Sequence, residues 1–233
     1  SLTFTTANWN TAQTVTLAAA EDVDLANGSA VFDVTSTGLS TVNVTGTEAD
    51  NDAQSLVVSS TNVLVTEGLT NTFTVKLAFQ PAANVTVSVA RASGDTDLSV
   101  SGGASLTYTP ANWNTAQTVT LAAAEDVDLT NGSAVFNVTA VGLTTVNVTG
   151  TEADNDAQSV VVSSTNVLVT EGLTNTFTVK LAFQPAANFT VNVARASGDT
   201  DLSVSGGSSL TFTTANWNTA QTVTLAAAED VDL

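Results

Sequence analysis

Hydrophobic and polar residues alternate along most of this chain, in short segments separated by Gly, Pro, Asn and Asp. In the segment 72–79, Phe73, Val75, Leu77 and Phe79 fall on one face, with Thr72, Thr74 and Lys76 on the other. A period of two predicts β-strands with one buried face. Because no stretch of a dozen residues has helical periodicity, we expect an all-β protein.

Between residues 53 and 156 this pattern predicts about seven or eight strands, the first of them split in two. The Ala-rich run 122–124 continues a Thr-Val-Thr-Leu alternation and is therefore predicted as strand. The predicted strands are 56–60 with 63–66, then 72–79, 85–89, 98–100, 106–109, 119–124, 134–139 and 146–150. So many short strands in roughly 100 residues are typical of an immunoglobulin-like β-sandwich.

The chain also repeats itself with a period of 104 residues. Residues 1–104 and 105–208 differ at only 11 positions, and 209–233 is identical to 1–25. A repeat of this length is a whole domain rather than one turn of a solenoid. The sequence therefore predicts tandem immunoglobulin-like sandwiches with near-identical sequences.

Acidic runs that recur between the repeats suggest the domain boundaries. We expect residues 1–52 to be the C-terminal half of one sandwich, 53–156 a complete sandwich, and 157–233 the N-terminal three-quarters of the next. Such ends are expected of a segment cut from a longer repetitive protein. The alternative is complementation between molecules, because the 27 residues of 26–52 and the 77 of 157–233 together equal one period, as in polymers that add a strand from a neighbour.

The net charge of −18, with four basic residues among 233, excludes some classes of partner. Nucleic acids and anionic lipid surfaces both require a basic footprint, so neither is expected as a partner. No apolar run approaches the roughly 20 residues that span a bilayer, so no membrane insertion is expected in this segment. The absence of Cys excludes disulfides and thiolate metal ligands. The absence of Cys and Met suits an exposed extracellular protein.

Of the 22 acidic residues, all except Asp33 belong to four motifs that recur with the repeat. In a sandwich, alternate strand ends lie at the same pole, so all four motifs are expected together at the C-terminal pole, next to the following domain. In the complete repeat they comprise Glu67; Asp95 and Asp97; Glu125, Asp126 and Asp128; and Glu152, Asp154 and Asp156.

Nine carboxylates at one pole, with no basic residue in the motifs, would repel one another strongly. Two like charges about 4 Å apart at an effective dielectric constant near 20 interact by roughly 4 kcal/mol. Carboxylate oxygens in number, without nitrogen or sulfur donors, are the ligands of Ca²⁺, whereas Mg²⁺ prefers fewer protein ligands. Calcium sites are therefore expected, and a merely solvated acidic end is the alternative. A glycosidase carboxylate pair is disfavoured because nothing distinguishes an acid from a base.

These motifs resemble the Calx-β domain over the whole repeat: Val-Thr-Glu67-Gly, Gly-Asp95-Thr-Asp97, Glu125-Asp-Val-Asp128 and a closing acidic run. The closing run is also similar to the calcium-binding linker of cadherins. The resemblance implies the calcium ligands Glu67, Asp97, Asp126, Asp128, Asp154 and Asp156, with Asp95, Glu125 and Glu152 as second choices. The neighbouring repeats add Asp22, Asp24, Asp50, Asp52, Glu171, Asp201, Asp230 and Asp232. The near-identical copies and Ala-Asn-Trp-Asn hairpins are more similar to repeats of large bacterial surface and secreted proteins than to regulatory exchanger domains.

We therefore expect a structural protein, a calcium-rigidified extracellular bacterial rod or fibre whose partners are its own neighbouring repeats. A carbohydrate-binding or accessory spacer module of a secreted enzyme is the alternative, in which Tyr108 or Trp113 would stack on sugar. Trp113 is expected instead to cover one end of the core. An enzyme is not expected, because the chain has no His and every candidate acid is duplicated. Asn-x-Ser/Thr triplets, the acceptor sequence for N-linked glycosylation, occur at Asn43, Asn84, Asn137 and Asn147, among others. They arise readily by chance in a composition rich in Thr and Asn, so they do not by themselves predict glycosylation.

Overall fold

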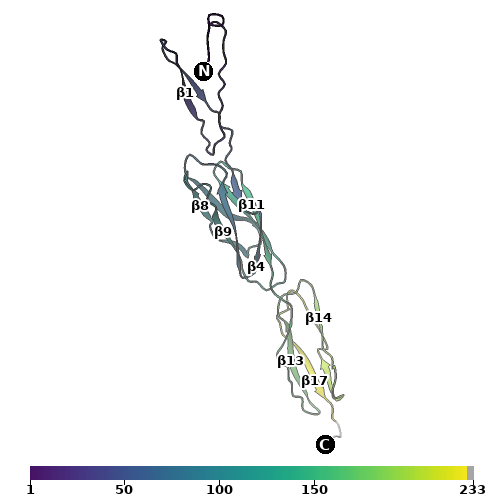
Figure 1. Ribbon diagram of the computed structural model, residues 1–233. Coiled ribbons are helices and arrows are strands. Elements are labelled where there is room, and N and C mark those ends of the chain that lie inside the picture. The colour runs from purple at the N-terminus through teal and green to yellow at the C-terminus, as the bar shows by residue number, and fades with distance from the viewer. Residues whose placement is uncertain (230–233) are drawn as a thin grey trace.

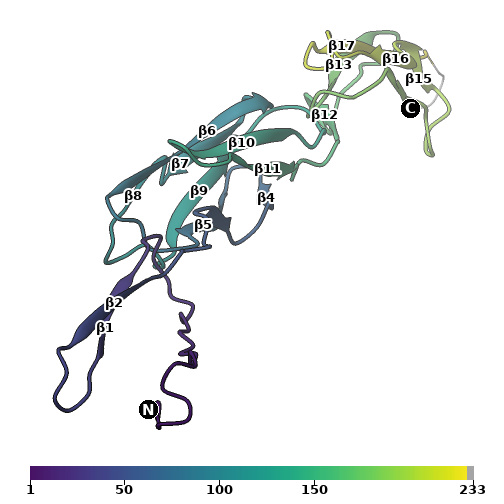
Figure 2. The ribbon, with the colours of Figure 1, turned by 90° about the horizontal axis from the view of Figure 1, so that it is seen from above.

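A computed structural model describes residues 1–229 of the chain. The described residues are all-β and form an elongated series of bodies, with the N-terminal residues at one end and the last described strands at the other (Figure 1). A view at right angles shows the same series (Figure 2). Within the described range there is no helix, and hence none that could cross a membrane. The predicted fold class is confirmed.

The central unit, defined here as residues 53–156, contains two facing sheets. One sheet has the order β3 (Leu56–Val58), β5 (Thr70–Leu77), β9 (Gln117–Ala123), β7 (Leu98–Gly102). The other has the order β4 (Asn62–Thr66), β11 (Val146–Ala153), β10 (Ser133–Ala140), β6 (Val85–Gly94), β8 (Ser105–Tyr108). Neighbouring strands are antiparallel except β4 and β11, which are parallel. The split first strand thus contributes to both sheets of an immunoglobulin-like sandwich.

The alternating apolar residues form the core between these sheets. Phe73, Val75 and Leu77 of β5 are buried as predicted. Tyr108 is also buried, and its hydroxyl donates a hydrogen bond to the Val75 carbonyl at 2.5 Å. Because burial disfavours the ionised phenol, the pKa of Tyr108 is raised to about 12. Trp113 packs on this core, which agrees with a core-covering role rather than a sugar-stacking one.

Strand β11 differs from the prediction because it continues to Ala153. Its extra residues pair in parallel with β4, which brings Glu152 opposite Val65. Glu152 was expected in the acidic run after the last strand, but it is a strand residue. The same kind of cross-strand pairing extends β6 to Gly94, while β9 ends at Ala123, so that Ala124 lies just outside it.

The first unit, residues 1–52, contains one hairpin, β1 (Ser29–Val34) with β2 (Val42–Thr47). The last unit, described from 157 to 229, contains two sheets. Their orders are β12 (Val160–Val162), β13 (Thr174–Leu181), β17 (Gln221–Ala227), β15 (Leu202–Gly206), and β14 (Phe189–Asn192) with β16 (Ser209–Phe212).

Strands are lost in the last unit where their partners are missing. Residues 166–170 have the same sequence as β4 but form no strand, since no counterpart of β11 pairs with them. Likewise, β14 has 4 residues whereas the corresponding β6 has 10. Pairing with a neighbour, and not local sequence, decides whether these segments become strands.

Candidate metal centre

Glu67 follows β4 directly and is the most enclosed acid contributed by the turns. Its backbone N–H donates to the Ala153 carbonyl at 3.0 Å, which fixes it beside the end of β11. Gly68 then reverses the chain with a φ of 71°, a left-handed conformation that favours glycine. Glu67 is 2% exposed, although it is a carboxylate.

Glu152 lies opposite this turn, near the end of β11, and is 1% exposed. Its backbone N–H donates to the Gly132 carbonyl at 2.9 Å. Its carboxylate Oε2 accepts the Gly132 N–H at 3.3 Å. The alternation of β11 thus points this side chain into the end of the sandwich instead of outward to solvent.

The loop between β9 and β10 wraps around the Glu67 carboxylate. The Asp126 N–H donates to Glu67 Oε1. Asp126 Oδ1 then accepts the Asp128 N–H at 2.8 Å, and Asp128 Oδ1 accepts the Thr130 N–H at 2.7 Å. These successive turns leave each of the two aspartates with a second carboxylate oxygen that accepts none of these turn bonds.

Residues 154–156 after β11 close the other side of the centre. The Asp154 N–H donates to Asn131 Oδ1 at 2.8 Å, and the Asp156 N–H donates to Asp154 Oδ1 at 2.6 Å. The Asn155 side chain donates to the Glu67 carbonyl at 3.0 Å. The segment after the last strand is therefore fixed to the central unit that precedes it.

Two groups of carboxylates converge here, and they share Glu67. One group is Glu67, Asp126 and Glu152, and the other is Glu67, Asp154 and Asp156. Within each group the facing oxygens lie within 4.8 Å of one another. One oxygen each of Glu67, Glu152 and Asp156 is buried without a hydrogen-bond donor. Buried carboxylate oxygens without donors are costly, so this donor set suits a hard cation that takes oxygen ligands.

The other predicted acids surround these two groups. The Asp95 carboxyl carbon and Glu152 Oε2 both approach Gly132, at 2.7 and 2.8 Å from the position a Cβ would take there. The Glu125 carboxyl carbon approaches Gly68 similarly, at 2.9 Å. Asp97 donates its N–H to Asp95 Oδ1 at 3.0 Å. All four acidic motifs of the central unit therefore reach one pole, as the strand pattern predicts.

Burial, together with the mutual repulsion of these acids, raises several pKa values. Burial first, with Asp126, Asp95 and Glu67 nearby, raises the pKa of Glu152 to about 6. Burial followed by the charge of Glu67 also raises the pKa of Asp156. At Asp126 the hydrogen bond from Asp128 lowers the pKa, but burial and the neighbouring charges together outweigh it and the pKa is raised. A bound cation would relieve this repulsion.

Arg91, a basic residue that the acidic motifs did not predict at this pole, stabilises one of its loops. Arg91 Nη1 donates to the carbonyls of Gly94 at 3.1 Å and Asp95 at 2.8 Å. The guanidinium thereby fixes the loop that carries Asp95. Arg195, one repeat further along the chain, donates to the carbonyls of Gly198 and Asp199 in the same way. The 104-residue repeat is therefore the sequence signal that could have identified both arginines.

The first junction brings together a different set of the recurring acids. Asp22, Asp24 and Asp50 bring oxygens within 4.8 Å of one another. One Asp50 oxygen is buried without a donor, and burial followed by the charge of Asp50 raises the pKa of Asp52. Glu21, which was not among the predicted ligands, also raises the pKa of Asp52.

In the last unit the structure describes two of the predicted ligands, Glu171 and Asp201. Asp230 and Asp232 lie outside the described residues. Glu229 approaches Gly172 as Glu125 approaches Gly68, although Glu229 was not among the predicted ligands.

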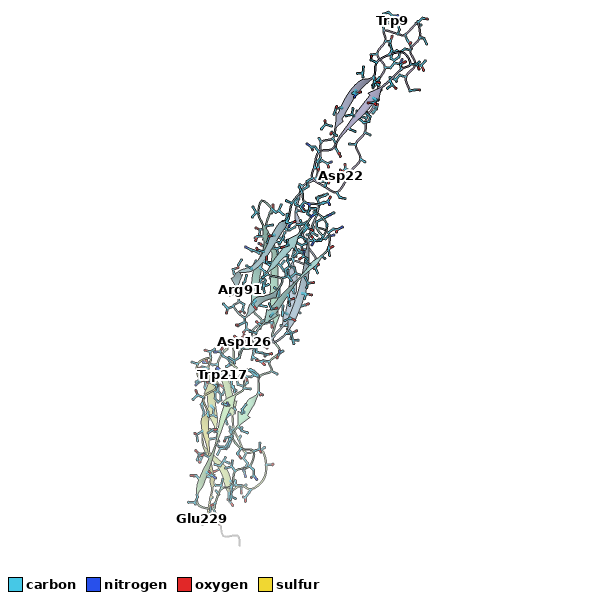
Figure 3. The ribbon with its side chains drawn as sticks, turned by 90° about the vertical axis from the view of Figure 1, so that its left-hand side faces the viewer. Trp9, Asp22, Arg91, Asp126, Trp217 and Glu229 are labelled. Carbon is cyan, nitrogen blue, oxygen red and sulfur yellow. The ribbon has the colours of Figure 1, made fainter. Side chains whose placement is uncertain are left out.

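The centre lies at the junction between units, where Asp126 lies near Trp217 of the last unit (Figure 3). The Gln184 N–H donates to the Val127 carbonyl at 2.7 Å, across the junction. At the first junction the Gln80 N–H donates to the Val23 carbonyl, also at 2.7 Å. In the central unit, the accepting residue lies between two candidate ligands, Asp126 and Asp128.

Comparisons with known proteins do not identify a family. No family model matches the chain, and no curated protein matches it. Among solved structures, Escherichia coli alpha-2-macroglobulin activated by porcine elastase is similar with a TM-score of 0.27 and 10% identity. That similarity covers 87% of this chain but 22% of the macroglobulin chain. A similarity this low bears on neither the function nor the ligands of this protein.

Proposed function

We propose that this chain is a calcium-binding structural segment whose metal sites stiffen the junctions between successive β-sandwiches. The observation that carries the proposal is the pair of buried glutamates, Glu67 and Glu152, each with a carboxylate oxygen that has no donor and faces other carboxylates. Calcium takes about six to eight oxygen ligands in flexible geometry, and this pole offers carboxylates, Asn131 and backbone carbonyls.

The carboxylates would form two cation positions, an inner one and an outer one. Glu67, Asp126 and Glu152 would hold a cation inside the end of the sandwich, and Glu67, Asp154 and Asp156 would hold one at the linker. Bound calcium would offset part of the negative charge of the pole and would strengthen the attachment of residues 154–156 to the central unit, which hydrogen bonds already provide. The proposed stiffness depends on this second effect.

The junction has little other freedom once these residues are fixed. Asp154 and Asn155 are bonded to the central unit. Gln158 already belongs to the last unit, since its side chain donates to the Phe183 carbonyl at 2.8 Å and accepts the Phe183 N–H. Few residues therefore remain between the two bodies, which favours a rod over a flexible string.

The proposal extends to an extracellular bacterial rod or fibre of Calx-β-like repeats, in an adhesin, matrix or sheath, without catalytic function. It includes self-association of neighbouring repeats as the principal interaction. The sugar-binding alternative receives less support, because Trp113 and Trp217 both pack on hydrophobic cores.

Calcium binding is tested by calorimetric titration and by thermal melting with calcium or with EGTA. At a calcium concentration of ten times Kd, each independent site adds about 1.4 kcal/mol to the free energy of unfolding, so EGTA should lower the melting temperature by several degrees. Glu67→Gln should reduce both effects. Asp33→Asn removes one charge outside the motifs, at a position where the next repeat has Asn137, and serves as the matched control. Melting that is the same in calcium and EGTA would remove the proposal.

Stiffness is tested by small-angle scattering on the same chain. The wild type should have a longer maximum dimension and a narrower range of shapes with calcium than without it. Asp154→Asn combined with Asp156→Asn should reduce that difference, because the second junction loses two candidate ligands while the first junction keeps its own, and the central sandwich should stay folded. If the wild type is equally extended in both conditions, calcium binds without stiffening the junction.

A further inference from the structure

The loop that leads into β10 contains the dipeptide Asn131-Gly132. Both residues lie in irregular backbone just before Ser133, the first residue of the strand. The Asn131 side chain is exposed. The same dipeptide recurs one repeat earlier, as Asn27-Gly28. A glycine that follows an asparagine leaves its backbone nitrogen unshielded, because it has no Cβ, so this nitrogen can reach the asparagine side chain.

Space, and not backbone conformation, requires the glycine at position 132. Gly132 does not have a positive φ. A Cβ there would lie 1.7 Å from Asp95 Oδ2 and 2.8 Å from Glu152 Oε2. Two carboxylates of the acidic pole thus occupy the place that a side chain would take. The pole therefore excludes other residues after Asn131 and keeps the nitrogen beside it unshielded.

Hydrogen bonds polarise both groups that would react. The side-chain oxygen of Asn131, Oδ1, accepts the Asp154 N–H at 2.8 Å. This bond makes Asn131 Cγ more electrophilic, and it would stabilise the negative charge that develops on Oδ1 during attack. The Gly132 N–H donates to Glu152 Oε2 at 3.3 Å, so a carboxylate already attracts the proton that must leave. Within the described residues, the Asn131 nitrogen Nδ2 makes no hydrogen bond that would retain it.

Asn71 of β5 is equally exposed but has the opposite arrangement. Its Nδ2 donates to the Leu64 carbonyl at 2.7 Å, and its Oδ1 accepts the Thr72 N–H at 2.8 Å. The nitrogen that would attack is thus held by a hydrogen bond, carries a β-branched residue and belongs to a strand that pairs with β9. Asn71 is therefore protected and provides a reference within the same unit.

The first repeat has the same contact to its asparagine as the central one. The Asp50 N–H donates to Asn27 Oδ1 at 2.8 Å. A Cβ at Gly28 would lie 2.7 Å from Glu48 Oε2. The arrangement around the dipeptide therefore belongs to the repeat and is not an accident of one loop.

We propose that Asn131-Gly132 is a site of spontaneous deamidation in the folded protein, and that the reaction adds a further carboxylate to the acidic pole. A base from solvent removes the Gly132 N–H proton, and the nitrogen attacks Asn131 Cγ to form a new C–N bond. The bond from Cγ to Nδ2 then breaks, and Nδ2 takes a proton from water and leaves as ammonia. Water opens the resulting succinimide. Cleavage at Cγ gives aspartate, and cleavage at the main-chain carbonyl gives isoaspartate.

Both products place a carboxylate where the Asn131 amide holds the Asp154 N–H. Aspartate keeps the backbone length and an oxygen that can accept this N–H, whereas isoaspartate lengthens the backbone by one methylene group. The reaction itself does not depend on calcium. Its effect on metal binding rests on the proposed function, under which aspartate at position 131 supplies a further oxygen ligand.

The test is incubation of the full chain in metal-stripped, mildly alkaline buffer, with and without urea, followed by tryptic peptide mapping with mass spectrometry. Trypsin separates Asn71, in peptide 1–76, from Asn131, in peptide 92–180, and fragmentation locates the modified residue. In the folded chain Asn131 should be converted several-fold faster than Asn71, with aspartate and isoaspartate at the same position. Asn131→Gln should lose the conversion at this position, because attack would have to close a larger ring. Conversion of Asn131 in urea but not in the folded chain would overturn the proposal.

The effect on the metal centre is tested separately with Asn131→Asp, which supplies the aspartate product directly. This variant should melt below the wild type in EGTA, because it adds a charge to the repelling pole, and it should bind calcium more tightly in calorimetric titration. Calcium affinity equal to that of the wild type would overturn the ligand role of residue 131. If neither chain binds calcium, the proposed metal function fails, while the peptide map alone decides whether the folded protein deamidates.

Discussion

At the scale of single residues, buried Glu152 destabilises the fold without metal but would stabilise it as a ligand when a cation binds. Its folded-state pKa of about 6 lies above the ordinary value of 4.5, so the folded state binds more protons than the unfolded state between these pH values. The free energy of unfolding without metal should therefore fall as pH rises through this window and remain lower above it. This burial is unfavourable until a cation binds.

Glu152→Gln should consequently have opposite effects in the two conditions. In metal-stripped buffer near neutral pH the variant should melt roughly a few degrees above the wild type, since it replaces a buried charge with a neutral amide. With calcium it should melt below the wild type, because one ligand is lost. Melting curves at pH 4.5 and pH 7 in both buffers, with Asp33→Asn for comparison, check this. A variant less stable than the wild type in metal-stripped buffer at pH 7 would contradict the assigned repulsion.

At the scale of elements, the end of β6 depends on close contact with β10. Gly94 has a φ of 92°, and a Cβ there would lie 2.7 Å from the Ala134 Cα in β10. Gly198 in the last unit has a φ of 94°, but a Cβ there would meet nothing within 4 Å. These two glycines of the repeat therefore differ in packing while sharing the same backbone conformation.

Gly94→Ala should cost the central unit about 2–4 kcal/mol, from left-handed strain and overpacking together. Gly198→Ala should lower the free energy of unfolding of the last unit by about 1–2 kcal/mol, from strain alone. Urea unfolding followed by fluorescence checks both, with Trp113 as the reporter for the central unit and Trp217 for the last, the other tryptophans being replaced by Phe. Equal costs at the two positions would show that β10 does not limit the space at Gly94.

Elements were predictable from sequence where their pattern is local. The alternation of Phe73, Val75 and Leu77 was sufficient to predict β5, and turn residues indicated most strand ends. The extension of β11 was not predictable, because Thr151 and Glu152 look like the start of an acidic linker and become strand only by pairing with β4. The carboxylate pole followed from strand order, whereas the Gln184 contact with Val127 uses a backbone N–H, which no side-chain pattern reveals.

At the scale of the whole molecule, equivalent hydrogen bonds recur at the two junctions, which favours a similar relation between consecutive units. Gln80 and Gln184 make the same contact with the preceding acidic loop, at the same length. A constant relation between neighbours generates a regular rod, whereas variable relations generate a flexible chain. The units therefore repeat along the sequence, and the hydrogen bond that joins each unit to the next repeats with them.

The parallel pair β4–β11 gives the central unit a direction in which it resists force. Tension along the chain pulls β4 through its N-terminal end and β11 through its C-terminal end, in opposite directions along one ladder. All bonds of such a ladder are loaded in shear together, whereas a hairpin pulled apart from its open end loses them one by one. In single-molecule pulling from the two chain ends, the last unit, which lacks this ladder among its described residues, should extend at low force and the central unit at a clearly higher force. Extension of both units at the same force would show that the β4–β11 pair does not raise the force that the central unit withstands.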